Sequence, residues 1–426
     1  MFNRLVAYSK SVRKSSPFLK HVLTLMTGTA LGQAVVFFIM PFITRIFGRE
    51  LLGELGAYNS VAAVIVTIAA SRYDMAIMLE RDDANAKVVA VFALRSISVF
   101  AVLSTVTALL LKPIVRAHFS DTVATWLPFI GITTFFLAGA GTLQYWYNRK
   151  TDYKTIATNR VQQQIGQAGG QLACGLLGWI ALPGLIVGQT IGQAFAFLNL
   201  SIRAKDLRTI DISNAAPMRT LVRKHWKMPL LNGPNVLLDA VRTNGINLMI
   251  GAVSVGSLGE FIIASTTVQV PVHLINSAVS QVFFQKLSLI ESGDMYREVK
   301  GAIIRAFVVG IPPFALFYII APWLLPLYFG ASFPNTGYYA QALIPWLGML
   351  LVTSPISTMF VTTGTQHWML IFSAFYTVVP MAWLWWTPYD LLTTVYILGA
   401  LMGACLLVMT GMALVGARRF DQRVEN

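Results

Sequence analysis

Between residues 232 and 247, ionisable and amide side chains recur at helical spacing inside an otherwise apolar part of the sequence. Asn235, Asp239 and Arg242 fall at positions i, i+4 and i+7, so they share one face of a helix. A charge at the centre of a bilayer costs about 2.5–3.5 kcal/mol on insertion scales, and such groups seldom face lipid. Two interpretations stay open. Asp239 and Arg242 form an ion pair that fixes helix packing, or the three side chains line a hydrated cavity that binds an anion.

Three further arginines lie at the edges of apolar runs. Arg72, with Asp74 beside it, ends the second expected helix, while Arg95 and Arg305 lie one to two turns inside the third and ninth. A guanidinium suits an anionic group because its planar fork binds two oxygens at once. The alternatives are an interfacial anchor for Arg72 and Asp74, and snorkelling to lipid headgroups for Arg95 and Arg305.

The apolar run 160–181 is rich in amides, of which Gln164, Gln167 and Gln171 share one helical face. Amides can donate to and accept from the hydroxyl groups of a ligand without a net charge. They can equally hydrogen-bond between helices that pack closely through small residues. His273 carries the side chain that ordinarily exchanges a proton near neutral pH and suits a proton-coupled step, although a lone membrane histidine is more often a packing residue.

Membrane-spanning helices must position these side chains. The chain has 426 residues, of which 56% are hydrophobic and only 12% are charged, whereas a soluble domain has about 25% charged residues. A span needs about 20 apolar residues. The apolar runs predict twelve spans: 22–44, 56–78, 87–111, 123–147, 160–181, 183–202, 229–252, 260–284, 300–325, 338–362, 367–387 and 390–416.

The basic residues are distributed unevenly over the expected loops. With the N-terminus inside, 25 of the 32 lysines and arginines fall on inner segments, 4 on outer segments and 3 within helices. By the positive-inside rule, both termini and the loop 203–228 are cytoplasmic. Residues 1–21 are expected to form a cytoplasmic interfacial segment. The net charge of +14 then faces anionic lipid and indicates no nucleic-acid partner.

Short motifs recur in the same order in the two halves. Residues 52–55 (Leu-Gly-Glu-Leu) match residues 258–261 (Leu-Gly-Glu-Phe), and residues 127–131 match residues 344–348. Because each half has six spans, both halves enter from the same side, which predicts a parallel repeat with a pseudo-twofold axis along the membrane normal. The expected domains are the interfacial segment 1–21, the N-terminal lobe 22–202, the basic loop 203–228, the C-terminal lobe 229–416 and the tail 417–426.

The sequence offers little for bond-breaking chemistry. Cys174 and Cys405 both lie in apolar runs, and no spacing of cysteine and histidine indicates a metal site or a disulfide framework. The longest expected outer connection, 112–123, carries no paired carboxylates, nucleophile elbow or metal triad. We therefore expect a protein that is not an enzyme and has no cofactor.

Several motifs resemble those of a known family, the Wzx-type flippases of the polysaccharide transporter family, which belongs to the multidrug/oligosaccharidyl-lipid/polysaccharide exporter superfamily. The resemblance is concentrated in residues 45–165 and extends in topology over most of the chain. The motifs that carry it are residues 53–58 (GELGAY), 72–79 (RYDMAIML) with Asp82 and Asp83, 147–150 (YNRK), 153–154 (YK) and 159–163 (NRVQQ).

The resemblance implies two six-helix lobes around a central cavity. It implies that undecaprenyl-diphosphate-linked oligosaccharide, as used for O-antigen and lipopolysaccharide, moves from the cytoplasmic to the periplasmic leaflet of the bacterial inner membrane by alternating access. Partners would be that ligand, membrane lipid and other polysaccharide assembly proteins. Because the diphosphate and the sugars cannot enter hydrocarbon, cations and amides must line the path. We expect this cavity to be lined by Arg242, Asp239, Asn235, Gln164, Gln167, Gln171, Arg72, Asp74, Arg95 and Arg305, with His273 as a candidate for ion coupling.

Three other functions stay open. A multidrug or metabolite exporter of the same superfamily would have the same helices but an apolar pocket with one or two carboxylates, whereas cations in or bordering the helices outnumber acids here. A membrane-embedded envelope polymerase or glycosyltransferase would present a large periplasmic loop or a soluble catalytic domain. A lipid II flippase of the same superfamily usually has two further helices.

Overall fold

The structure, a computed structural model, describes residues 17–213, 215–288, 293–357, 359–363 and 365–422. All secondary structure in these ranges is helical, which confirms the prediction of an all-α membrane protein. The first half holds α2 (Pro17–Ala69), α3 (Tyr73–Ala76), α4 (Asp83–Leu110), α5 (Lys112–His118), α6 (Asp121–Trp126), η1 (Leu127–Phe129), α7 (Ile130–Arg149), α8 (Tyr153–Leu176) and α9 (Leu182–Arg203). The rest holds α10 (Lys205–Thr209), α11 (Met218–Lys224), η2 (Met228–Asn232), α12 (Gly233–Val253), α13 (Val255–Ser288), α14 (Met295–Phe329), α15 (Thr336–Ile356), α16 (Met359–Thr362), α17 (Gln366–Trp386) and α18 (Leu391–Gln422).

Within the described residues, ten helices are long and apolar enough to cross a membrane. One of them, α2, consists of two spans joined at Gly48, where φ is 70°. In addition, the 24-residue helix α8 is too polar to be among the ten but packs beside α2 and α9. With α2 divided and α8 included, these ranges contain the twelve spans that the sequence predicts.

Two predicted spans have wrong boundaries. The predicted span 56–78 is helical over 49–69, and the chain then turns at Ser71 and Arg72, both with positive φ. The predicted span 160–181 is α8, which begins at Tyr153 because the Asp152 carboxylate caps it by accepting from the Thr155 amide at 3.1 Å. The other ten predicted spans agree with the structure to within six residues at each end.

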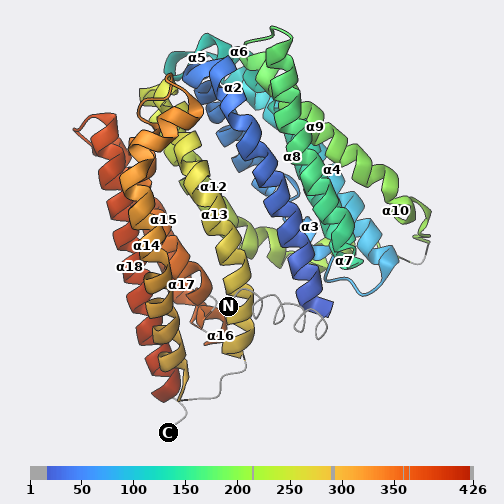
Figure 1. The fold of residues 1–426 in the computed structure, drawn as a ribbon. Coiled ribbons are helices and arrows are strands. Elements are labelled where there is room, and N and C mark those ends of the chain that lie inside the picture. The colour runs from blue at the N-terminus through green and yellow to red at the C-terminus, as the bar shows by residue number, and fades with distance from the viewer. Residues whose placement is uncertain (1–16, 214, 289–292, 358, 364, 423–426) are drawn as a thin grey trace, which may run out of the picture.

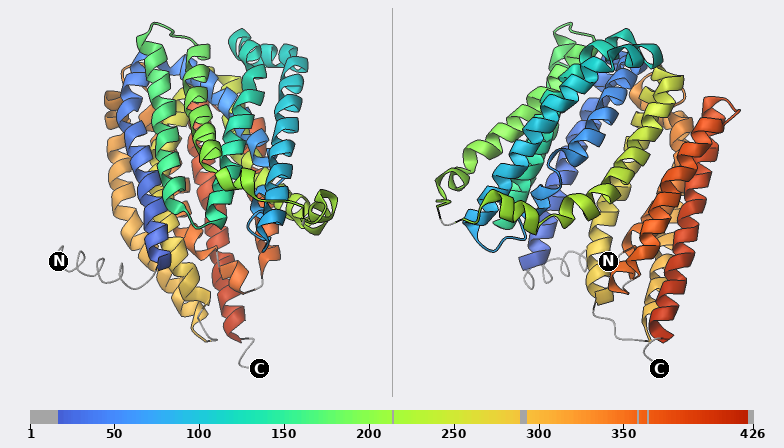
Figure 2. Two further views of the ribbon diagram at one scale, coloured as in Figure 1. Left: turned by 90° about the vertical axis from the view of Figure 1, so that its right-hand side faces the viewer. Right: turned by 180° about the vertical axis from the view of Figure 1, so that it is seen from behind.

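The helices gather into two lobes that lie side by side (Figures 1 and 2). We call α2 to α9 the N-lobe and α12 to α18 the C-lobe. The start of α2 and the end of α18 lie at one end of the bundle, here the inner end, and α5 and α6 lie at the other, the outer end (Figure 1). Residues 1–16 and 423–426, which belong to the expected interfacial segment and tail, lie outside the described residues.

The two copies of the Leu-Gly-Glu motif meet in a contact that we call the outer seam, residues 49–56 against residues 255–262. A Cβ added to Gly53 would lie 1.8 Å from the carbonyl oxygen of Val255, and a Cβ added to Gly259 would lie 2.2 Å from that of Arg49. Gly53 and Gly259 are 206 residues apart, as are Arg49 and Val255. The two contacts are therefore reciprocal, which is what a twofold axis between two copies requires. Only glycine permits this close approach of two backbones.

Polar contacts also join the lobes across the outer seam. The Arg49 guanidinium donates from Nη1 to Oε1 of Glu260 at 3.0 Å, and the Glu260 side chain is fully buried. The backbone amide of Asn335 donates to the other oxygen of Glu260 at 2.5 Å. Nearby, the Thr44 hydroxyl donates to the carbonyl of Phe329 at 2.6 Å. Separation of the lobes at this end would have to break the ion pair between Arg49 and Glu260.

The expected topology can be tested at two exposed serines. Single cysteines at Ser213, between α10 and α11, and at Ser332, between α14 and α15, are expected to react with a membrane-impermeant maleimide from opposite sides of the membrane. Ser213 should react from the cytoplasmic side, because the adjoining segment is rich in lysine and arginine. Labelling of both positions from the same side would refute the topology.

Candidate functional site

Helix α8 has two faces with different residues. Gly166 and Gly170 form the first, where they approach Gly192 and Gly188 of α9 so closely that any added Cβ would meet the backbone opposite. Small residues at this spacing are typical of close packing between membrane helices. The second face is polar and carries, at spacing i, i+4, i+7 and i+11, the side chains of Arg160, Gln164, Gln167 and Gln171. This polar face is the reason why hydropathy alone does not identify α8 as a span.

Part of that face lines a cavity of about 300 Å³ between helices of the N-lobe, which we call the polar pocket. Arg160 is exposed at this cavity. The walls of the pocket come from α2, α7 and α8, and they carry four glutamines, one threonine and one arginine. The lining residues are Gly28, Thr29, Gly32, Gln33, Gln144, Arg160, Gln163 and Gln164. Arg160 is the only titratable residue among them, so the pocket is positively charged.

The Arg160 guanidinium is positioned by neighbours on both other helices. Its Nε donates to Oε1 of Gln144 at 3.2 Å, and its Nη1 donates to the hydroxyl of Thr29 at 3.4 Å. These described contacts use two of the five N–H donors of a guanidinium. The remaining donors suit an oxyanion that enters the pocket, because a guanidinium binds carboxylate and phosphate oxygens in pairs.

A second charged group adjoins the polar pocket at the inner end. Arg72, Asp74 and Arg160 all lie close enough to the Tyr145 hydroxyl to interact with it electrostatically. Burial raises the pKa of the Asp74 carboxyl above its ordinary value, and the positive charge of Arg72 only partly offsets this effect. Arg72 also donates from Nε to Oδ1 of Asn232 at 3.0 Å, so it contacts the segment that leads into the C-lobe.

An apolar cavity of about 580 Å³ lies between the lobes, where α2 faces α13 and α14; we call it the apolar pocket. Aromatic and aliphatic side chains dominate its walls, among them Phe37, Ile263, Val270 and Phe317. Gln33 lines both this pocket and the polar pocket. Residues 28–40 of α2 therefore separate a charged cavity from an apolar one.

In the C-lobe, Arg242 and Asp239 of α12 form the expected ion pair. The Arg242 side chain is 14% exposed and its guanidinium carbon lies 4.4 Å from the ring centre of Tyr376, whereas the Asp239 side chain is 64% exposed. Tyr376 is itself fixed, because its hydroxyl accepts from Nε1 of Trp346 at 2.5 Å. The buried Nε of Arg242 has no hydrogen-bond partner among the described residues. Arg242 is thus largely buried against Tyr376, beside an accessible carboxylate.

Two of the expected cavity residues are exposed and line neither the polar pocket nor the apolar pocket. Arg95 is exposed on α4 and is followed at i+4 and i+7 by Val99 and Val102, which are also exposed. Arg305 is exposed on α14, and Val309 at i+4 is 71% exposed. Large apolar side chains exposed along a spanning helix contact lipid, so these placements favour the snorkelling alternative for both arginines.

The other expected residues are dispersed. Gln167 is half-buried on the polar face of α8, and Gln171 donates to the Leu185 carbonyl of α9 at 3.5 Å, which supports its packing interpretation. His273 is exposed on α13, so its coupling role stays a prediction. The side chain of Asn235 lies outside the described part of the structure.

Arg160 is not among the site residues that the sequence predicts. The fifth span is expected to begin at this arginine, which places it among the inner basic residues. A signal was present, since Arg160 is in helical phase with Gln164, Gln167 and Gln171. Gln144, Thr29 and Gln33 had no comparable signal, because they lie on other helices and join the site only through the packing of α2, α7 and α8.

Comparisons with known proteins indicate the family and the fold. A family model described as polysaccharide biosynthesis protein matches residues 42–336. No curated protein shows a significant match.

Several solved structures share the fold. The lipid II flippase MurJ in an inward closed conformation has a TM-score of 0.72 at 12% identity, covering 95% of this chain and 90% of that one. An inward-facing multidrug resistance MATE family transporter of the MOP superfamily has a TM-score of 0.62 at 16% identity, covering 90% and 95%. A MOP superfamily transporter from Pyrococcus furiosus, whose binding pocket is described as having reverse polarity, has a TM-score of 0.59 at 15% identity, covering 96% of each chain.

The likeness to these structures concerns the fold, because every identity lies below 25%. The family match spans more than half of the chain. This multi-pass membrane protein therefore belongs to the polysaccharide biosynthesis protein family and has the fold of the MOP superfamily transporters.

Proposed function

We propose that this protein is a flippase of the Wzx type that moves undecaprenyl-diphosphate-linked oligosaccharide from the cytoplasmic to the periplasmic leaflet of the bacterial inner membrane. One observation carries the proposal. Residues 28–40 of α2 line a positively charged, amide-rich pocket and also an apolar pocket that lies between the lobes. A ligand that fills both must have an anionic, hydrogen-bonding head and an apolar tail.

The chemistry of a lipid-linked sugar meets these demands. Its isoprenoid tail gains free energy from apolar surroundings, whereas the diphosphate and the sugars are costly to place in hydrocarbon. In the polar pocket, Arg160 supplies charge-assisted donors for the diphosphate. The glutamines that share the pocket can donate to and accept from sugar hydroxyls. No bond is broken in this process, so binding and release suffice.

The family match and one structural relative support the same substrate class. The matched family is described as polysaccharide biosynthesis protein, and the structural relative with a TM-score of 0.72 is a lipid II flippase. For transport by alternating access, the lobes must separate at the outer end. The outer seam suits this step, because it is held by a backbone contact and by the ion pair of Arg49 with Glu260.

Export of drugs or metabolites is the competing function. Export of a cationic drug would favour a carboxylate in the pocket, since opposite charges attract. The polar pocket carries a guanidinium and amides, and Arg160 is its only titratable lining residue. This polarity favours an anionic head group.

The function can be tested in a strain that lacks the gene and has lost its surface polysaccharide. Expression of the protein is expected to restore the polysaccharide and to remove lipid-linked oligosaccharide that accumulates in the inner membrane. Drug susceptibility of the two strains is compared in the same experiment. Unrestored polysaccharide together with a gain in drug resistance would overturn the proposal in favour of an exporter.

Arg242 provides a prediction for the C-lobe. Arg242→Ala is expected to lower export of lipid-linked oligosaccharide about tenfold, because a charge-assisted hydrogen bond contributes about 1.5–3 kcal/mol. Arg242→Lys should restore only part of the export, since an ammonium lacks the planar fork. Asp239→Asn should have a smaller effect, because it leaves the guanidinium in place. Export is measured as surface polysaccharide, with membrane levels of each variant as the control. Full export by well-expressed Arg242→Ala would leave Arg242 as a helix-packing residue.

A further inference from the structure

We infer that the connection between the lobes, residues 204–227, is a fixed part of the N-lobe, and that the lobes move about the turn η2, residues 228–232. In this arrangement Glu80 is a positioning residue that holds the connection in place. The inference rests on the proposed transport by alternating access. It concerns which segment moves and where the chain bends, whatever the identity of the substrate.

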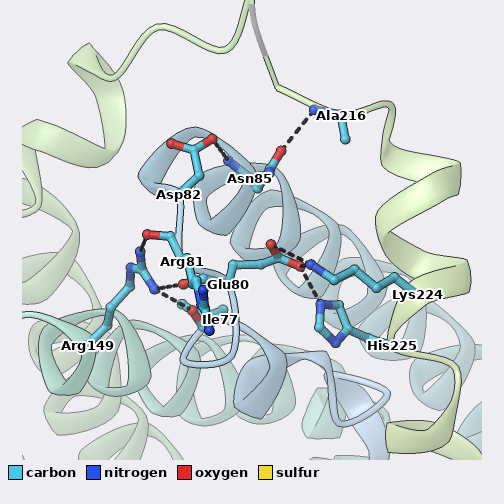
Figure 3. A network of polar contacts seen from close by, with 9 residues as sticks. All are labelled: Ile77, Glu80, Arg81, Asp82, Asn85, Arg149, Ala216, Lys224 and His225. Carbon is cyan, nitrogen blue, oxygen red and sulfur yellow. Dashed lines mark hydrogen bonds and ion pairs between the residues drawn. The ribbon is translucent and has the colours of Figure 1, made fainter.

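The strongest contact centres on Glu80, in the turn between α3 and α4 (Figure 3). Its side chain is only 2% exposed. Lys224 donates from Nζ to its two carboxylate oxygens at 2.8 and 3.0 Å, and Nε2 of His225 lies 2.5 Å from Oε1. Without these partners the buried carboxylate of Glu80 would be left without compensation, which is strongly destabilising. Glu80 therefore holds Lys224 and His225 of the connection against the N-lobe.

The ionisation of Glu80 follows from the same neighbours. Burial acts to raise the pKa of the Glu80 carboxyl, but the hydrogen bonds from Lys224 and His225 lower it by more. The pKa therefore lies below its ordinary value, and the group is a carboxylate at neutral pH. Glu80 therefore carries the negative charge that its ion pair with Lys224 requires.

The turn that carries Glu80 is itself held by the N-lobe. Arg149, at the end of α7, donates from Nη1 to the carbonyls of Ile77 and Glu80, and from Nη2 to the carbonyl of Arg81 at 3.0 Å (Figure 3). The same Nη2 pairs with the Asp83 carboxylate at 2.8 Å. The Arg149 side chain is only 13% exposed. One guanidinium therefore fixes the backbone on both sides of Glu80.

The rest of the connection also contacts the N-lobe. Lys87 donates from Nζ to the carbonyl of Ile210 at 2.7 Å, and the amide of Ala216 donates to Oδ1 of Asn85 at 2.8 Å. The Tyr73 hydroxyl donates to the carbonyl of Val222 at 3.1 Å.

Apolar packing follows the same pattern. Leu221 of α11 is 2% exposed and belongs to the same apolar core as Ala86 of α4 and Trp146 of α7. The connection is thus attached to the N-lobe along its length by both polar and apolar contacts.

The backbone becomes less regular directly after the connection. Residues 228–232 form a π-helical turn, which is a rare and less regular conformation than the α-helix. Pro229 and Pro234 lack the N–H that a helical hydrogen bond needs, and Gly233 between them adds backbone freedom. Beyond this turn α12 packs on α2, α13 and α17. A bend at η2 would move α12, which carries Arg242, without disturbing the Glu80 contact. Within the turn itself, the bend would change the hydrogen bond that Arg72 donates to Asn232.

Distances between spin labels can test which lobe the connection follows. Labels are attached to cysteines at three exposed positions: Arg81 in the N-lobe, Arg223 in the connection and Lys300 in the C-lobe. Pairs of labels are measured by pulsed electron resonance in nanodiscs, with and without lipid-linked oligosaccharide. We expect the 81–300 and 223–300 distances to change together, while the 81–223 distance keeps one narrow distribution. A changing 81–223 distance with a constant 223–300 distance would overturn the inference. A constant 81–300 distance would instead contradict lobe motion, and with it the proposed transport mechanism.

A charge-neutral variant tests the role of Glu80 itself. Glu80→Gln is expected to broaden the 81–223 distribution, because Lys224 and His225 lose their buried counter-charge. Asp211→Asn is the matched control, since Asp211 is an exposed carboxylate of the same connection that accepts from the amide and the hydroxyl of Ser213. Lys224→Met serves as a second variant if Glu80→Gln is not recovered in the membrane. An 81–223 distribution as narrow in a recovered variant as in the control would remove Glu80 from this role.

Discussion

Replacing Arg160 by glutamine is expected to reduce transport of lipid-linked oligosaccharide by roughly tenfold to a hundredfold. The reason is the loss of the only cation that lines the polar pocket among the described residues. Charge-assisted hydrogen bonds contribute about 1.5–3 kcal/mol, and 1.4 kcal/mol corresponds to about a factor of ten. Glutamine keeps a hydrogen-bonding side chain, so the effect reports the charge. Arg160→Lys should retain part of the activity, because an ammonium supplies charge but no bidentate fork.

The measurement is restoration of surface polysaccharide, together with retention of the lipid-linked ligand by the purified protein in native mass spectrometry. Arg297→Gln is the matched control, since Arg297 is an exposed arginine at the inner end of α14 that pairs with Asp294. The control should behave like the unaltered protein. If Arg160→Gln is well expressed and both transports and retains ligand at normal levels, the polar pocket is not the head-group site.

Gly53→Ala is expected to shift the protein away from the conformation in which the outer seam is closed. The added Cβ would lie 1.8 Å from the Val255 carbonyl oxygen, so the two backbones must move apart. Forcing an extra carbon into a packed contact costs about 1–3 kcal/mol, which lowers the closed population by roughly five- to a hundredfold. Transport should fall accordingly, because alternating access needs both conformations.

Opening of the outer seam can be followed with a cysteine at Leu258, which is fully buried beside it. In Gly53→Ala this cysteine should react with an impermeant maleimide from the periplasm several times faster. Gly141→Ala is the matched control, because a Cβ at Gly141 meets no atom within 4 Å among the described residues. Equal labelling rates in the two variants would show that the outer seam does not control access.

The sequence predicts the architecture well where one physical rule dominates. Long apolar runs must span the membrane, so the number of spans and most of their ends follow directly. The repeated Leu-Gly-Glu motif predicts the duplication, and the structure shows why glycine recurs there: Gly53 and Gly259 occupy reciprocal backbone contacts. The predicted start of a span is wrong where a capping residue sets the start of the helix, as Asp152 does for α8.

The candidate site is only partly readable from the sequence. Helical phase predicts that Asp239 pairs with Arg242 and that Gln164 shares a face with other amides, and the structure contains both features. Phase within one helix cannot show which residues of other helices complete a pocket. The sequence therefore does not predict that Arg160 bonds to Thr29 of α2 and Gln144 of α7. Nor can phase distinguish an exposed arginine such as Arg95 from one that bonds to another segment, as Arg72 bonds to Asn232.

Translocation by the purified protein tests the central claim most directly. The protein is reconstituted into vesicles that contain a lipid-linked oligosaccharide with a fluorophore on its sugar, and impermeant dithionite is added outside. Vesicles without protein should lose about half of the fluorescence, because only the outer leaflet is reached. With the protein we predict nearly complete loss, and with Arg160→Gln a loss close to that of empty vesicles over the same period. If vesicles that hold correctly folded protein lose no more fluorescence than empty ones, the protein is not a flippase of lipid-linked sugars.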